Sequence, residues 1–427
     1  MALNYIWVGF FLIAFIAALT KSIFFGDWGV FERIMNGTFT MAKVSVMDIA
    51  LPLTGTMILW LGLMNVGQKA GAINFLARII GPFFEKLFPE IPKDHPVNGE
   101  LVMNFSANML GLDNAATPLG LKAMKSLQEL NPNKDSASNA QIMFLALNTS
   151  GLTIMPIAIM TQRAILGAAN PTDIFIPLLL STFASTIIAI LYVGIRQGLD
   201  LTNKIVMTTL LSAIAFIAAS IAIFWALGNG AQWNIDFFRI HYTITKETIV
   251  IVSKVASNFV LFSIIIAFLG VALFKRINVY EAFIDGAKDG FHTSVKVMPY
   301  LVGMLVAIGV MRDSGALNFL LDIVKFSLGW LNDTRFVDAL PTAIIKPLSG
   351  SGAKAIMIET MTTYGVDSFP GKLSCLFQGA ADTTFYIIAL YFGSVGIKKT
   401  RYAVSAGLVA DIGGAIAAIF IAYAFFS

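Results

Sequence analysis

Four otherwise apolar segments of this sequence are each interrupted by a short stretch rich in Gly, Pro, Asn, Asp, Ser or Thr. The interruptions are NMLGLDNAATPLG at 108–120, LNTSGLTIMP at 147–156, KPLSGSGAK at 346–354 and FQGAADTTFY at 377–386. Such residues end a helix and leave backbone N–H and C=O groups unpaired. Helix N-termini exposed in this way attract polar or anionic groups, and freed carbonyl oxygens bind cations. The interruptions are therefore the first candidates for a binding site.

The side chains at the interruptions carry amide, hydroxyl and carboxylate groups. These groups suit a neutral solute that forms hydrogen bonds, and Asn, Ser and Thr oxygens together with backbone carbonyls also suit a hard cation. The alternative is that the polar residues only cap helices and close tight turns. The residues that we expect to bind the solute are Asp113, Asn114, Thr117, Ser349, Ser351, Gln378, Asp382 and Thr383.

Two of these residues, Asp113 and Asp382, would place carboxylates inside a membrane. An intramembrane carboxylate needs a cationic partner or a watery cavity, because lipid cannot solvate its charge. Lys122, Lys125 and Lys354 could supply that partner, or their long side chains could extend to the membrane interface instead.

The amino-acid composition indicates the class of protein that must position these residues. The chain has 427 residues, of which 57% are hydrophobic and 13% are charged, whereas soluble domains carry about 25% charged residues. The sequence therefore predicts a polytopic membrane protein. Its net charge of +4 is modest, and in a membrane protein such an excess comes from basic residues that set the orientation of loops. We therefore expect a lipid bilayer and no nucleic acid as a partner.

Common catalytic motifs are absent from the sequence. It contains no GxxxxGK, HExxH, GxSxG or CxxC pattern. Its single cysteine, Cys375, cannot form an intramolecular disulfide, and its histidines, His95, His241 and His292, are far apart in the chain. We expect no enzyme, no zinc site and no organic cofactor.

Long uninterrupted apolar stretches predict ordinary spanning helices. Segments 72–90 and 316–331 instead combine an apolar face with charged residues, which indicates helices lying along the membrane interface or, alternatively, buried packing helices. The predicted spanning helices cover residues 5–24, 44–64, 173–195, 205–228, 247–274, 295–312 and 402–425.

A weak internal repeat relates the two halves of the chain. GAINFL at 71–76 matches GALNFL at 315–320, and two of the four interruptions follow each of these segments in the same order. Positive clusters follow the last helix of the first copy but precede that of the second, which indicates that the copies are inverted. The predicted domains are an N-terminal transmembrane helix at 1–29, a first repeat at 30–195, a two-helix transmembrane linker at 196–278 and a second repeat at 279–427.

The predicted fold is therefore an all-α polytopic membrane protein with two inverted repeats and additional scaffold helices. Each repeat contains an interfacial helix, a re-entrant helical hairpin and a broken transmembrane helix. Inverted repeats with paired broken elements are typical of secondary transporters that bind their solute near the membrane midplane.

Three long motifs carry a resemblance to known families. HPVNGELVMNFSANMLGLDNAATPLGLKAMKSLQ at 95–128 closely resembles the spore maturation protein A family. KPLSGSGAKAIMIE at 346–359 and DSFPGKLSCLFQGAADTTFYIIALYFGSVGIKKTRYA at 367–403 closely resemble the spore maturation protein B family. The A-like part covers about 1–195 and the B-like part about 275–427, so the chain resembles a fusion of the two. Both families belong to the nucleoside recognition, or gate, domain group, which is related to concentrative nucleoside transporters.

This resemblance implies two re-entrant hairpins, two broken helices and, near the first hairpin tip and first broken helix, a Na⁺ site. The residues in matching elements are Asn108, Asn148, Thr149 and Ser150. The related transporters hold ribose hydroxyls with acidic residues at the hairpins. Here the second tip offers Ser349 and Ser351 without a carboxylate, and Glu359 lies further along. This departure weakens the expectation of a nucleoside.

Three classes of function follow from the sequence. The first is a secondary transporter of a small polar solute, such as a nucleoside or related metabolite, driven by Na⁺ or H⁺ through elevator-like or gated alternating access. The second is a membrane-embedded enzyme that uses Asp113 and Asp382. The third is a non-transporting sensor or scaffold in envelope or spore maturation. We expect the first class, in a bacterial cytoplasmic membrane and as a homo-oligomer.

Overall fold

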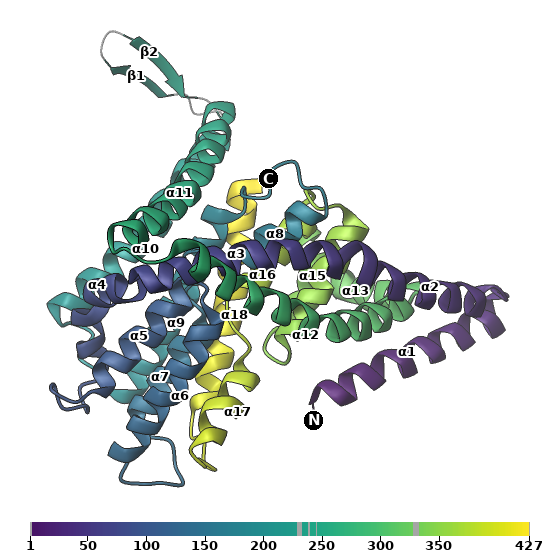
Figure 1. Ribbon diagram of the computed structural model, residues 1–427. Helices are drawn as coiled ribbons and strands as arrows, with labels where there is room; N and C mark the ends of the chain where they lie inside the picture. Colours follow the sequence, from purple (N-terminus) through teal and green to yellow (C-terminus); the bar gives the residue numbers. More distant parts are fainter. Residues whose placement is uncertain (1, 229–232, 238–239, 245, 328–332, 427) are drawn as a thin grey trace.

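The computed structural model describes residues 2–228, 233–237, 240–244, 246–327 and 333–426 (Figure 1). Within these residues, six helices are long and apolar enough to cross a membrane, or seven if one bent helix pair is a single span. The all-α polytopic prediction is confirmed. The exception to the helical pattern is an antiparallel pair of short strands, β1 (Trp233–Phe237) and β2 (Ile240–Ile244), which connects two helices.

Two long antiparallel helical arms lie side by side across the molecule (Figure 1). The first consists of α2 (Val30–Val44), the π-helical turn η1 (Ser45–Ala50) and α3 (Leu51–Ala70), and the second is α12 (Val279–Asp313). The sequence predicts separate spans at residues 44–64 and 295–312, but each is part of one of these longer arms. In the first arm, the π turn lies just before Pro52, whose missing N–H interrupts the regular ladder without ending the helix.

Glycines allow the two arms to approach closely. Gly286 and Gly290 face the carbonyls of Leu61 and Met57, and a Cβ at Gly290 would lie 2.5 Å from the Met57 oxygen. This GxxxG spacing is the arrangement that lets helices pack backbone to backbone in membranes. Asn65 donates a hydrogen bond of 2.6 Å to the Ala282 carbonyl across the same contact.

Each arm ends at a left-handed glycine and continues as an amphipathic helix. The turns are Gly71 (φ 94°) and Gly315 (φ 81°), and the helices are α4 (Ala72–Leu87) and α13 (Ala316–Ser327). Between α12 and α13 the chain bends by 71°. Helix α4 buries one face against α5 and exposes its charged residues, as its sequence pattern predicts.

Both predicted helical hairpins form. The first consists of α5 (Val97–Met109) and α6 (Asp113–Leu130). The second consists of the 3-10 turn η2 (Arg335–Ala339), α14 (Leu340–Ile345) and α15 (Gly350–Tyr364). We call these hairpin 1 and hairpin 2. Their tips, residues 110–112 and 346–349, are the non-helical breaks that the sequence indicated.

Both predicted broken helices also form. The first is α7 (Asn139–Ser150) followed by α8 (Ile157–Ile165), and the second is α16 (Phe369–Gly379) followed by α17 (Thr384–Ser394). Each begins with a serine N-cap: the side chain of Ser138 accepts from the Gln141 N–H at 3.2 Å. That of Ser368 accepts from the Gly371 N–H at 3.1 Å. We refer to residues 151–156 as break 1 and 380–383 as break 2.

The two broken helices run in opposite directions, as inverted repeats require. The end of α8 reaches the start of α16, where Arg163 donates to the Val366 carbonyl at 2.8 Å and pairs with Asp367 at 2.9 Å. At the other end, the Lys399 N–H that follows α17 donates to the Asp135 carbonyl, just before α7, at 2.9 Å. In Figure 1, α8 and α17 accordingly lie at opposite ends of the molecule.

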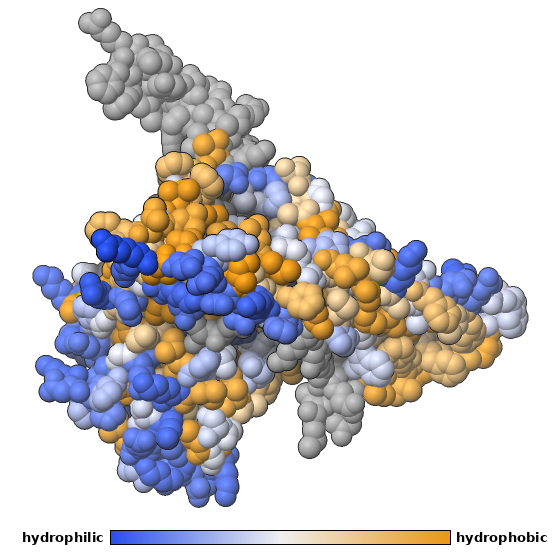
Figure 2. Space-filling view, viewed as in Figure 1, coloured by the Kyte–Doolittle hydropathy of each residue, from blue (hydrophilic) through white to orange (hydrophobic). Residues whose placement is uncertain are grey.

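The remaining helices surround this core. Helices α9 (Phe175–Gln197) and α18 (Ala403–Phe426) pack against each other and against α7, and Ser185 donates to the Ala410 carbonyl at 3.0 Å. Helices α1 (Ala2–Phe25), α10 (Lys204–Gly228) and α11 (Lys246–Phe274) lie at the periphery. A hydrophobic surface covers the flank formed by α1 (Figure 2), and Phe24, Phe25 and Trp28, at the end of this helix and just after it, are each more than three-quarters exposed. Lipid would cover such a flank.

Candidate functional site

The two breaks meet where the broken helices cross. The Asp382 N–H of break 2 donates a hydrogen bond of 2.6 Å to the Thr149 carbonyl at the end of α7. Gly151 adopts a left-handed conformation (φ 58°) that ends α7, and a Cβ there would lie 3.0 Å from the Asp382 nitrogen. This hydrogen bond therefore pairs backbone groups that the two breaks leave without a helical partner. Irregular backbone is tolerated at membrane depth when such groups are paired in this way.

The tip of hairpin 1 is bonded to break 1. The Ile154 N–H donates to the Met109 carbonyl at 2.7 Å. Gly111, also left-handed (φ 69°), lies against the Met155 carbonyl. Beside the tip, the Asn108 amide donates to the side-chain oxygen of Asn148 at 2.8 Å. Hairpin 1 and α7 thus present two linked amides at the crossing.

The tip of hairpin 2 is bonded to the two helices that flank break 2. The Phe385 N–H donates to the Pro347 carbonyl at 3.1 Å. The Gln378 amide donates to the Gly350 carbonyl at 3.3 Å. Gly350 packs against the hydroxyl of Thr383, where a Cβ would meet that oxygen at 2.7 Å.

A cavity of about 360 Å³ lies between these tips and breaks. Ligand pockets typically measure about 300–1,000 Å³, so a small solute fits. Its wall combines amide, hydroxyl, carboxylate and ammonium groups with aromatic rings. The lining residues are Asn108, Ala116, Thr117, Asn148, Gly151, Thr153, Lys346, Gln378, Gly379, Ala381, Asp382, Tyr386, Ile387, Leu390 and Tyr391.

The structure brings three of the predicted solute-binding residues, Thr117, Gln378 and Asp382, to the wall of this cavity. Others serve the backbone: Ser349 caps α15 by accepting from the Gly352 N–H at 3.0 Å, and its hydroxyl lies 3.4 Å from that of Ser351. Thr383 is buried against Gly350. Asp113 and Asn114 begin α6, but their side chains lie outside those that the structure describes.

Three of the four residues expected to bind Na⁺ lie at the crossing. Asn108 and Asn148 line the cavity. Thr149 is buried beside them, and its carbonyl accepts the hydrogen bond from Asp382. Ser150 lies on the far side of α7, where it accepts from Thr186 at 3.0 Å and donates to the Leu147 carbonyl. The oxygen donors of this group suit a hard cation, although Asn148 and Ser150 use theirs here in protein hydrogen bonds.

Three residues that the sequence interpretation did not select lie in or beside the site. Lys346 lines the cavity although only 8% of it is exposed. Tyr391 packs over Gly120, and its hydroxyl lies 3.5 Å from the Asn148 side-chain oxygen. Asp411 on α18 is buried and accepts from the Thr384 hydroxyl at 2.5 Å. The one signal in the sequence was the presence of Lys346 and Asp411 within strongly apolar segments.

The formal charges in the cavity wall balance. Lys346 contributes one positive charge and Asp382 one negative charge, and no other lining residue is an Asp, Glu, Lys or Arg. Asp382 is exposed to the cavity, and one of its oxygens accepts from the Thr383 N–H at 2.6 Å. A wall of this kind suits a neutral polar solute that forms hydrogen bonds, because a charged solute would leave one charge uncompensated.

The fold and this site define a multi-pass membrane protein with two matching sets of hairpin and broken helix around a polar cavity. The model of the Gate family, described as nucleoside recognition, matches residues 50–166 and 294–398. The chain belongs to that family.

The chain is also similar to two curated proteins. It is 38% identical to spore maturation protein A of Bacillus subtilis (strain 168) over 188 residues, which are 44% of this chain and 92% of that protein. It is 43% identical to spore maturation protein B of the same organism over 147 residues, which are 34% of this chain and 82% of that protein. No solved structure matches the chain significantly. The resemblance to a fusion of the two families is thereby confirmed.

Proposed function

We propose that this protein is an ion-coupled secondary transporter of a small neutral polar solute, such as a nucleoside or related metabolite, in the bacterial cytoplasmic membrane. The observation that carries the proposal is the cavity of about 360 Å³ at the crossing of the two breaks. A polar cavity bounded by paired broken helices is the usual place for a transported solute. The description of the family as nucleoside recognition supports a nucleoside as the first solute to test.

The hairpins would act as the gates. Each hairpin is tied near its tip to the neighbouring broken helix by a backbone hydrogen bond, Ile154 to Met109 for hairpin 1 and Phe385 to Pro347 for hairpin 2. Opening a gate would break this backbone bond, and closing it would enclose the solute between amide and charged groups. The arms and α4 and α13 would form the scaffold against which the hairpins move. The protein would move its solute without changing it chemically.

Two sites could bind the coupling ion. The Asn108–Asn148 amide pair with the nearby carbonyls suits Na⁺. Asp411 suits a proton instead, because it is 7% exposed and its second oxygen has no hydrogen-bond partner among the described residues. Each site therefore predicts a different driving gradient.

The test combines binding and flux. The midpoint of thermal unfolding of the purified protein is measured with nucleosides, nucleobases and small polar metabolites, in Na⁺ and in K⁺, since a ligand of the folded state raises this midpoint. Uptake of the best ligand into proteoliposomes is then measured under Na⁺ or pH gradients, with Asp411→Asn as the variant that would abolish pH-driven uptake alone. Concentrative uptake supports a transporter, and binding without flux contradicts it.

The second candidate is a membrane sensor or scaffold, which the names of the relatives favour, since both are spore maturation proteins. Such a protein would keep the fold and the cavity but would carry no solute. A folded protein that neither binds nor transports any member of the panel would favour this candidate. Cross-linking in the native membrane would then show the partner and would also test the homo-oligomer that we propose.

A further inference from the structure

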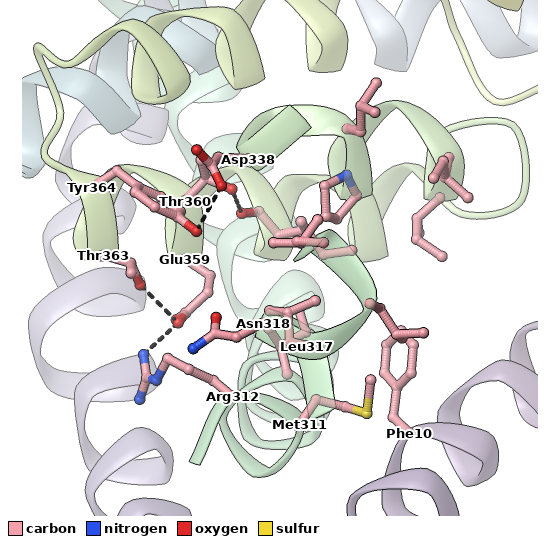
Figure 3. A pocket seen from close by; sticks show the side chains of 18 of the residues that line it. Phe10, Met311, Arg312, Leu317, Asn318, Asp338, Glu359, Thr360, Thr363 and Tyr364 are labelled. Carbon is pink, nitrogen blue, oxygen red and sulfur yellow. Dashed lines mark hydrogen bonds and ion pairs between the residues drawn. The ribbon is translucent and has the colours of Figure 1, made fainter. Parts of the chain in front are cut away.

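A second pocket, separate from the solute cavity, lies between α13, hairpin 2, α12 and α1 (Figure 3). Its volume is about 260 Å³. Most of the wall is apolar, with Phe10, Met311 and Leu317 among its residues. Figure 3 shows Phe10 and Met311 at one end and the polar side chains Arg312, Glu359 and Thr363 at the other. The pocket therefore has an apolar body and a polar end.

Glu359 provides the polar end with an unused acceptor. The residue is 5% exposed. Its Oε1 accepts from Arg312 and, at 3.0 Å, from the Thr363 hydroxyl. Its Oε2 is buried and has no hydrogen-bond partner among the described residues. A buried carboxylate oxygen without a donor costs free energy, which a ligand with an N–H group would recover.

The charges around this end are not balanced. Arg312 is shared between Glu359 and Asp313, which lies 3.2 Å from its Nε atom. On the other side of the pocket, Asp338 pairs with Lys325 at 2.8 Å and accepts from the Tyr364 hydroxyl at 3.3 Å. Of the charged residues that line the pocket, Asp338 and Glu359 are acidic and Arg312 is basic, so the wall itself carries one more negative than positive charge. The excess negative charge favours a cationic ligand group.

We propose that this pocket binds a primary amine attached to an apolar body. The ammonium group pairs with the Glu359 carboxylate, and the alkyl or aryl body fills the apolar part between α13 and hairpin 2. The ammonium supplies both the missing donor and the missing positive charge, whereas an alcohol supplies only a donor and a carboxylate supplies neither. This site does not depend on the transport function proposed above.

The ligand can reach the pocket from the bilayer. Among the lining residues, Leu320 is 44% exposed and Ile344 is 64% exposed, so the rim is apolar. An amphipathic molecule enters through such a rim with little desolvation of its apolar part. A primary ammonium group attached to an apolar body occurs both in an aminophospholipid and in a free aryl or alkyl amine. Probe binding in nanodiscs of different lipids separates these two sources.

The first repeat offers a matched control. A crevice between α4 and α5 occupies the corresponding place, and Asn74 lines it as Asn318 lines the pocket near Glu359. Hairpin 1 also carries a buried carboxylate with an unused oxygen, Glu100, paired with Lys122 at 3.2 Å. Glu100 does not line that crevice. Changing Glu100 thus reproduces the chemical change without touching an amine site.

The test uses 4-phenylbutylamine as the probe and 4-phenylbutanol as its neutral control, with the full chain in detergent. The apparent Kd is obtained from the rise in the midpoint of thermal unfolding with probe concentration. We expect Glu359→Gln to raise the Kd for the amine by about tenfold or more, because a charge-assisted hydrogen bond is lost. Glu100→Gln and Asp382→Asn should leave it unchanged. The alcohol should bind wild type more weakly than the amine does.

An unchanged Kd in Glu359→Gln, or equal binding of the amine and the alcohol, would overturn the proposal. Ile344→Trp provides a second variant, because it fills the pocket from its exposed rim without removing a charge. If Glu359→Gln does not fold, loss of amine binding in Ile344→Trp supports the site and unchanged binding overturns it. In nanodiscs, weaker probe binding in phosphatidylethanolamine than in phosphatidylcholine identifies an aminophospholipid as the occupant, and equal binding identifies a free amine.

Discussion

The two hairpin–break units share a backbone design but present different chemistry to the cavity. In each unit, a hairpin tip accepts one hydrogen bond from the broken helix that follows it, through the Met109 carbonyl in the first and the Pro347 carbonyl in the second. The first unit contributes the amides of Asn108 and Asn148. The second contributes the charged side chains of Lys346 and Asp382.

This difference separates the backbone bonds, which position the site, from the side chains, which select the solute. The shared backbone bonds set the cavity's shape, because they fix both tips and both breaks relative to one another. The side chains set its chemistry, with neutral donors and acceptors on one wall and a balanced pair of charges on the other. A solute would meet weaker hydrogen bonds on the first wall and charge-assisted ones on the second. The second unit should therefore contribute more to affinity.

The largest expected effect is that of Asp382→Asn. The substitution keeps the side-chain oxygen that accepts from the Thr383 N–H, so the local backbone should remain folded. It removes the negative charge that faces the cavity. We expect the Kd of the solute to rise about a hundredfold, since a hydrogen bond to a charged group is lost. Ligand-dependent thermal unfolding measures this change.

Asp135→Asn is the control for that substitution. Asp135 is exposed in the loop before α7, and its contact with the end of α17 is made by its backbone carbonyl. The Kd of this variant should equal that of wild type. If Asp382→Asn binds the solute as tightly as Asp135→Asn, the charged wall does not contribute to recognition and the contrast between the two units fails.

A smaller effect is expected from Gly151→Ala, which tests the contact between the units. Alanine is strained at φ 58°, and its Cβ would lie 3.0 Å from the Asp382 nitrogen. We expect the free energy of unfolding to fall by about 2 kcal/mol. Gly167→Ala is the matched control, because Gly167 has φ 78° but no neighbour within 4 Å of an added Cβ; it should lose about 1 kcal/mol.

Equal losses in the two glycine variants would show that strain alone matters and that the breaks do not support each other. A larger loss in Gly151→Ala, measured by chemical denaturation in the same detergent, would place the extra cost at the bond between Asp382 and Thr149. The solute should protect the wild type more than this variant, because the distorted break forms part of the cavity.

Most of the fold could be predicted from the sequence because its signals are local. Gly71 and Gly315 end the arms, Ser138 and Ser368 cap the broken helices, and uninterrupted apolar runs mark the spans. The lengths of the arms could not be predicted this way. Residues 30–43 and 279–294 are too polar to indicate spans, yet they are helical because they pack against the partner arm, and tertiary packing overrides composition there.

The candidate site was predicted less completely, because its geometry depends on contacts between distant segments. Ser349 and Ser150 are of a residue type that often binds ligands, but the hydroxyl of each forms a hydrogen bond with a nearby backbone atom. Lys346 lines the cavity only because the tip of hairpin 2 folds against break 2. The residue types at a break can be read from sequence, whereas the direction that each side chain takes depends on helices packed from the other repeat.

The smallest expected effect is that of Asn108→Ala on the neutral wall. The substitution removes the donor to Asn148, whose oxygen remains within 3.5 Å of the Tyr391 hydroxyl. We expect the Kd of the solute to rise about fivefold, the value of one neutral hydrogen bond, and any stabilisation by Na⁺ to disappear.

Asn104→Ala, one turn earlier on α5, removes a buried bond to the Ala116 carbonyl at 2.8 Å instead. That control should lower the midpoint of thermal unfolding while leaving the Kd and the Na⁺ effect intact. If Asn108→Ala weakens binding more than Asp382→Asn does, the first unit dominates recognition and the order of the two walls is reversed.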